Sequence, residues 1–229
     1  MTAVPFIIAL AVATLLFFVV ANLRSTKDVL SAGVLLRFYL YIASFVTLVV
    51  FVAGLTYLAT GLFSLGSQDF SYSRLVIPSA AIAPPGSSDA KVTSNQERQE
   101  QQSEERQRDQ QSTDLIRGGT LAVMGGGLFL LHAVLRRRTP PDELAEGNFY
   151  RGFLVVGLVT FGLVGLVALP VGAYQTLKFF LVAPLPTQMR VAPGNTLATG
   201  IVLTPLWVYY LLALSKQARA PRPTPALVE

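Results

Sequence analysis

The sequence predicts an all-α integral membrane bundle of about five transmembrane helices. Of the 229 residues, 52% are hydrophobic and only 14% are charged, whereas soluble domains carry about 25% charged residues. Most of the charges lie in a few short blocks. Between these blocks lie five apolar segments with no charged residue in their interiors. Each is close to the roughly 20 residues that a helix needs to cross a hydrocarbon core.

The five predicted spans begin with a leading anchor helix over residues 3–23. This segment lacks the basic stretch that opens a signal peptide, and its charges (Arg24 and Lys27) follow the apolar run. We therefore expect an uncleaved anchor. Backbone amides that face lipid must be paired within their own segment, so each span should be helical. The remaining predicted spans cover residues 38–63, 115–135, 152–174 and 197–214.

The distribution of basic residues predicts the orientation. With five spans, segments 24–37 and 136–151 and the tail lie on one side, where ten basic residues face five acidic ones. The opposite side holds eight of each. Cytoplasmic loops carry the excess of Lys and Arg. The N-terminus should therefore lie outside and the C-terminus in the cytoplasm.

A long polar external loop is predicted over residues 64–114. Its second half, residues 95–112, contains no hydrophobic residue. A helix there has no apolar face to bury, so disorder is the preferred interpretation. Two alternatives remain open. Gln, Glu and Arg favour helix, and Glu104 and Arg108 have i,i+4 spacing, which together allow a fraying helical extension of the third span. The loop could also be a docking segment for an external partner.

An internal repeat links the second and fourth predicted spans. A shift of about 111 positions along the chain aligns six identical residue pairs. They are Phe38 with Phe149, Tyr39 with Tyr150, Gly54 with Gly165, Leu55 with Leu166, Leu58 with Leu169, and Gly61 with Gly172. The repeat predicts two parallel helical hairpins, residues 36–138 and 139–216. They are preceded by an N-terminal anchor and loop (1–35) and followed by a tail (217–229).

Three short motifs carry a resemblance to a known family. They are Arg37 to Tyr41, Gly126 to His132, and Arg136 to Arg138. Over residues 36–216 the chain resembles a family of uncharacterised bacterial multi-span membrane domains of unknown function. The residue after the histidine departs from the pattern, because it is Ala133 where an aromatic residue is expected. The resemblance implies a bacterial cytoplasmic (inner) membrane and supplies no activity.

His132 is the only histidine, and there are no cysteines. An ionisable residue within a membrane span is a functional hypothesis by default, here as a haem or chlorophyll ligand or a proton relay. The alternative, which we favour, is a neutral histidine near the headgroups that bonds a neighbouring carbonyl. The absence of cysteine excludes thiolate metal sites and disulfides.

A ridge of small residues, Gly118, Ala122 and Gly126, recurs at four-residue spacing and predicts close helix packing. Packing within the chain is favoured over packing between subunits. Pro170 and Pro205 lie inside predicted spans, where proline removes a backbone hydrogen bond and tends to kink the helix. A helix broken beside Thr204 is one way to form a mid-membrane substrate site.

These features favour a non-enzymatic accessory or structural subunit that packs against other membrane proteins in the lipid bilayer. We find no motif for phosphate binding, zinc catalysis or a serine nucleophile, and we expect no metal, cofactor or nucleic acid. The first alternative is a small oligomeric transporter or channel. The second is a pigment- or haem-binding protein that uses His132.

Overall fold

The computed structural model describes residues 32–75, 89–138, 143–182 and 189–219. They form four long helices, a one-turn helix and two two-residue strands: α2 (Ala32–Gly66), α3 (Gln68–Ser71), β1 (Arg74–Leu75), α4 (Asp89–Arg138), α5 (Glu143–Leu181), β2 (Met189–Arg190) and α6 (Gly194–Arg219). The four long helices are apolar enough to cross a membrane. The all-α bundle and four of its predicted spans are thereby confirmed. The predicted anchor, residues 3–23, lies outside the described residues.

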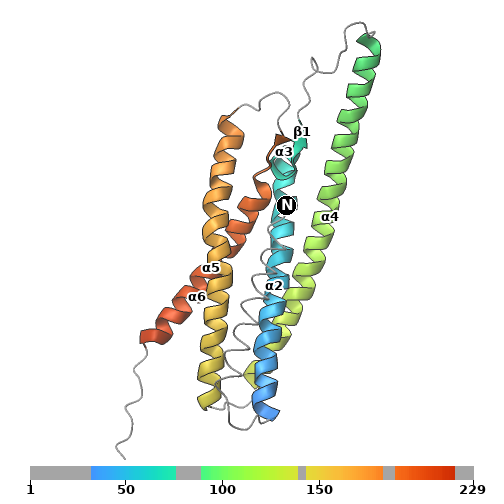
Figure 1. Cartoon of the computed structure of the whole chain (residues 1–229). Coiled ribbons are helices and arrows are strands. Elements are labelled where there is room, and N and C mark those ends of the chain that lie inside the picture. Colours follow the sequence, from blue (N-terminus) through green and yellow to red (C-terminus); the bar gives the residue numbers. More distant parts are fainter. Residues whose placement is uncertain (1–31, 76–88, 139–142, 183–188, 220–229) are drawn as a thin grey trace, which may run out of the picture.

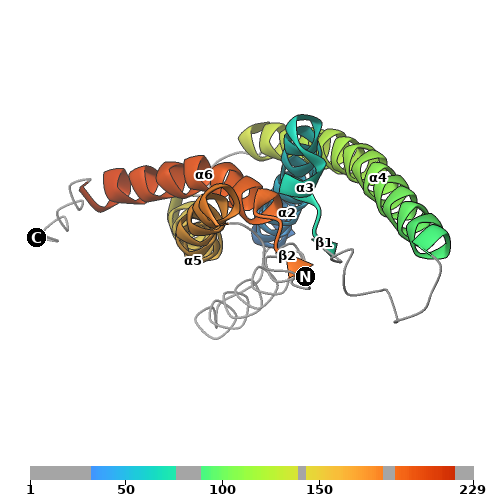
Figure 2. The ribbon, with the colours of Figure 1, turned by 90° about the horizontal axis from the view of Figure 1, so that it is seen from above.

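The helices form two antiparallel hairpins that run in the same direction, as the repeat predicts. In Figure 1, α2 rises and α4 returns, and then α5 rises and α6 returns. Helix α2 is central, because it contacts α4, α5 and α6. Figure 2 shows α4 on one flank of α2, with α5 and α6 on the other. At the end where the hairpins turn, β1 pairs with β2 in antiparallel register and joins the two hairpins.

Backbone-to-backbone contact holds α2 against α4. A Cβ added at Gly54 would collide with the backbone nitrogen of Ala122. One added at Gly118 would lie 2.6 Å from the backbone nitrogen of Leu58, and one at Gly125 would lie 2.6 Å from that of Phe51. Glycine is therefore required at three successive levels of this interface, because backbone atoms cannot rotate out of the way.

At one end of the second hairpin, aromatic side chains fill the space beside the glycines. The ring of Tyr210 fills the space where Gly157 lacks a Cβ. Trp207 lies against Gly162, with its Cδ1 atom 2.8 Å from where a Cβ would be. Toward the other end the contact returns to backbone, with Gly172 against Leu197.

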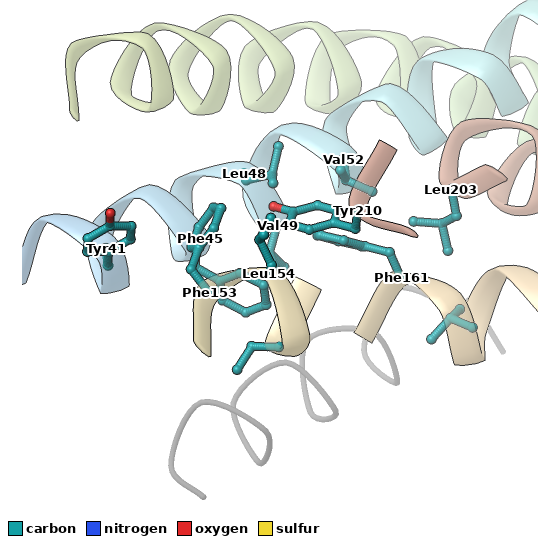
Figure 3. Close-up of a cluster of buried hydrophobic side chains, with 12 residues drawn as sticks. Tyr41, Phe45, Leu48, Val49, Val52, Phe153, Leu154, Phe161, Leu203 and Tyr210 are labelled. Carbon is teal, nitrogen blue, oxygen red and sulfur yellow. The ribbon is translucent and has the colours of Figure 1, made fainter. Parts of the chain in front are cut away.

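One apolar cluster joins α2, α5 and α6 (Figure 3). Phe161, Leu154 and Leu203 are fully buried in it. Phe45 contributes from α2, with its ring centroid 5.9 Å from that of Phe161. The Tyr210 ring from α6 lies 5.7 Å from Phe161. Because this cluster ties α6 to α2 as well as to α5, the second hairpin and α2 share one core.

The preference for disorder over residues 95–112 is wrong. Helix α4 begins at Asp89 and continues without a break to Arg138, so the predicted 64–114 loop contains the first half of a 50-residue helix. Helix nucleation is the costly step, and adding residues to an existing helix is easy. The membrane half of α4 supplies the nucleus, and the Gln, Glu and Arg residues extend it. Gln107 on this extension is buried against α3 and donates a hydrogen bond to Asp69 Oδ1 (3.4 Å).

The two prolines lie inside unbroken helices. Pro170 is within α5 and Pro205 is within α6, and both helices continue past them. Both side chains are exposed. Thr204 is committed to its own helix, because its hydroxyl donates a hydrogen bond to Gly200 O (2.7 Å). The broken-helix arrangement considered for a substrate site is therefore absent from α5 and α6 as described.

Candidate functional sites

His132 lies near the basic end of α4, beside Tyr39 of α2. Its Nδ1 donates a hydrogen bond to Leu128 O, 2.7 Å away, one turn earlier on the same helix. The edge of the Tyr39 ring lies against it at 6.2 Å between centroids. This carbonyl bond is the one that the interfacial alternative describes. It leaves Nε2 as the atom that would ligate a cofactor, and cofactor binding stays a prediction.

The small-residue ridge faces α2 of the same chain. Gly118 and Ala122 are buried in that contact. Gly126 lies at its border, where an added Cβ would be 3.1 Å from the Phe51 ring. Gly125, which lies beside the ridge in sequence, makes one of the three closest backbone contacts with α2.

A second set of residues lies on the opposite face of α4, which faces away from the bundle. We call this set the outer seam. Its members recur at alternating four- and three-residue spacing, the period of a helix-packing stripe. They are all exposed: Ile116, Thr120, Val123, Gly127, Leu130 and Val134. Nothing lies within 4 Å of where a Cβ on Gly127 would be.

The basic end of the bundle contains an arginine stacked on aromatic rings. The Arg136 guanidinium carbon lies 4.8 Å from the centroid of the Tyr41 ring, which belongs to α2. It lies 5.5 Å from the centroid of Phe153, which belongs to α5. Phe153 in turn contacts Tyr210 of α6 at 5.8 Å. All four long helices therefore meet at this point.

The opposite end contains a polar cluster that sequence reasoning missed. Tyr72 follows α3 and donates a hydrogen bond to Asp114 Oδ2, 3.1 Å away on α4. Burial, together with the nearby Asp114 carboxylate, raises the pKa of the Tyr72 hydroxyl well above its ordinary value. Arg117, one turn after Asp114, lies over the Tyr57 ring at 5.5 Å. The residues are far apart in sequence, so no local pattern signals their meeting.

Several interior hydroxyls are bonded to carbonyls of their own helices. Thr56 donates to Val52 O, and Thr60 donates to Thr56 O. Thr160 is fully buried, and within the described residues its hydroxyl has no hydrogen-bond partner. In the part of the chain that the structure describes, no three His, Asp or Glu side chains gather in a way that could hold a metal ion.

Comparison with known proteins gives no relative for this arrangement. No family model, no curated protein and no solved structure matches the chain. The family resemblance carried by the short motifs therefore stays a prediction.

Proposed function

We propose that the chain is a non-enzymatic accessory subunit that packs against another membrane protein through the outer seam of α4. The observation that carries this proposal is the imbalance in burial among the spans. In the apolar window of α4, 11% of the residues are buried, against 50% in both α2 and α5. Within the part of the chain that the structure describes, most of the apolar window of α4 is therefore open to lipid or to another protein.

The composition of the outer seam favours a protein partner over lipid alone. Apolar lipid tails are covered well by large aliphatic side chains, whereas small and hydroxyl residues are enriched where membrane helices pack together. Gly127 lies between the exposed Val123 and Leu130, and Thr120 lies one step earlier, between the exposed Ile116 and Val123. A partner helix can approach the backbone closely at Gly127, and Thr120 can bond across the interface.

The polar half of α4 extends the same contact surface outside the membrane. In Figure 1, the upper part of α4 continues past α3 and away from the other helices. Residues 89–112 have a length of about 36 Å at the rise of an α-helix. A helix that is polar on all sides buries little surface against its own chain. A partner outside the membrane would supply contacts for this half of α4.

Native extraction tests the proposal. After gentle solubilisation and native-size separation, the wild-type chain should travel with a defined partner. Gly127→Leu should release that partner without unfolding the chain, because the added side chain meets open space. Ala173→Leu is the matched control, since it adds similar bulk on an exposed position of α5. A wild-type chain that runs alone or as a homo-oligomer contradicts the proposal and directs work to liposome flux assays of the transporter alternative.

We also propose that the basic end faces the cytoplasm of a bacterial inner membrane, with the N-terminus outside. Among the described residues, this end carries seven basic side chains and two acidic ones, Glu143 and Glu146. The basic residues are Arg37, Arg136, Arg137, Arg138, Arg151, Lys216 and Arg219. This is the bias that cytoplasmic loops show.

Labelling of introduced cysteines tests the orientation, because the chain has none of its own. An impermeant maleimide added to intact cells should label Gln110→Cys on the polar half of α4. It should label Ala218→Cys, at the end of α6, only after the cells are opened. Both positions are exposed. The reverse pattern would invert the proposed orientation.

A further inference from the structure

We propose that Arg136 anchors a binding site for the phosphate group of an anionic phospholipid. Arg136 lies in the last turn of α4, where cations complement the partial negative charge of the final carbonyls. That effect alone accounts for the exposed Arg137 and Arg138. It does not account for Arg136, which turns back onto the rings of Tyr41 and Phe153.

Stacking leaves the hydrogen-bonding capacity of Arg136 unused. A guanidinium has five N–H donors in its plane, and contacts of its face with aromatic rings engage none of them. Within the described residues, Arg136 makes no hydrogen bond or ion pair, and its contacts are those with the two rings. The fixed, planar fork matches the oxygens of a phosphate, which it binds through two parallel hydrogen bonds.

The surroundings favour an anion. Arg37 precedes Tyr41 by one turn of α2 and is itself buried. Arg137 and Arg138 follow directly on α4, and Arg151 lies near the start of α5. Basic pockets between membrane helices bind the headgroups of anionic lipids in this way. The site lies where the span of α4 ends, so lipid phosphates are already present at its depth.

The test uses the purified full-length chain in neutral detergent, with thermal unfolding followed by the fluorescence of Trp207, its only tryptophan. Phosphatidylglycerol should raise the unfolding temperature and bind about tenfold tighter than phosphatidylcholine. Arg136→Gln should abolish that preference, because charged hydrogen bonds of this kind correspond to about a tenfold change in affinity or more. Arg136→Lys keeps the charge but loses the planar fork, and should retain part of the preference.

The matched control is Arg117→Gln. Arg117 also lies over a tyrosine ring, at the other end of the bundle, and its replacement removes the same charge. Each variant is compared with its own lipid-free sample, so a lower starting stability of Arg136→Gln does not obscure the result. Arg117→Gln should keep the full lipid preference.

Four results would overturn the proposal. If the two lipids have equal effects, Arg136 does not select an anionic headgroup. If Arg117→Gln and Arg136→Gln lose the lipid preference equally, the preference comes from the overall charge of the chain and not from a site at Arg136. An Arg136-dependent shift of the same size with inorganic phosphate would assign the site to a soluble phosphate compound. Stabilisation by an acidic peptide but not by phosphatidylglycerol would assign it to a protein partner.

Discussion

The two hairpins use glycine at their interfaces in different ways. Between α2 and α4, glycine lets backbone meet backbone, as at Gly54 against Ala122. Between α5 and α6, two glycines make room for large rings, as at Gly157 against Tyr210. The interface between α2 and α4 brings the two backbones close together, and it buries few residues of α4. The interface between α5 and α6 interlocks side chains and adds Tyr210 to the core shared with α2.

This difference teaches that a repeated sequence can yield two unequal helices. Helix α6 is fixed by rings that reach a three-helix core, so its position is determined within the chain. Among the described residues, helix α4 is held by a single face along α2, by polar contacts at one end and by Arg136 at the other. A helix held on one side only is suited to take a partner on the other.

The largest expected effect comes from Gly54→Leu. The new side chain would meet the backbone of Leu121 and Ala122, which cannot rotate away. We expect α4 to separate from α2 and the chain to lose roughly 3 kcal/mol, the upper part of the usual range for overpacking. Disulfide crosslinking of cysteine pairs placed across α2 and α4 would report the separation. Gly119→Leu, which meets open space on α4, should leave crosslinking intact.

A smaller effect is expected from Gly157→Ala. Its methyl group would overlap the Tyr210 ring, which is fully buried but is a side chain that can shift slightly. We expect a loss of about 1–2 kcal/mol in thermal unfolding. The double variant Gly157→Ala with Tyr210→Leu should be less destabilised than the sum of the single changes, because the overlap is gone. Strict additivity would show that the ring does not limit this interface.

The sequence predicts the spans better than it predicts their neighbours. Uninterrupted apolar runs, such as that around Val52, place a helix in the bilayer whatever it packs against. The spacing of Gly118 and Ala122 predicts a close contact but does not identify the facing helix. The meeting of Arg136 with Tyr41 and Phe153 depends on how three helices pack. No pairwise pattern along the chain encodes it.

The helical state of residues 95–112 was missed for a related reason. Amphipathicity measures what a helix can bury, and this segment has no apolar residue. In the structure, residues 95–112 are helical because they extend the helix formed by the membrane half of α4. Among the residues of this segment whose side chains the structure describes, Gln107 is the buried one, and it is polar and packs beside α3. A hydrophobic pattern cannot reveal a contact of that kind.

The smallest effect is expected from Tyr72→Phe, which tests whether the hydrogen bond between Tyr72 and Asp114 helps to hold α4 in place beyond its glycine contacts with α2. Tyr72→Phe removes the hydrogen bond to Asp114 and leaves that half-buried carboxylate short of a donor. We expect a loss of about 1 kcal/mol near neutral pH. Because the pKa of Tyr72 is raised in the folded chain, its contribution is full below about pH 10, where the unfolded tyrosine also stays protonated. It declines as the pH rises above that value, since the unfolded tyrosine ionises first.

The alkaline unfolding curve therefore separates this contact from the rest of the α2–α4 interface. The stability difference between wild type and Tyr72→Phe should narrow above about pH 10. Tyr174→Phe is the matched control for the loss of a tyrosine hydroxyl away from Asp114, because that tyrosine is exposed on α5. A constant difference between wild type and Tyr72→Phe across the pH range would mean that folding does not raise the Tyr72 pKa, and the proposed contact with Asp114 would then not hold this end of α4. Helix α4 would then be fixed by its glycine face and by Gln107, and its outer half would be freer to follow a partner.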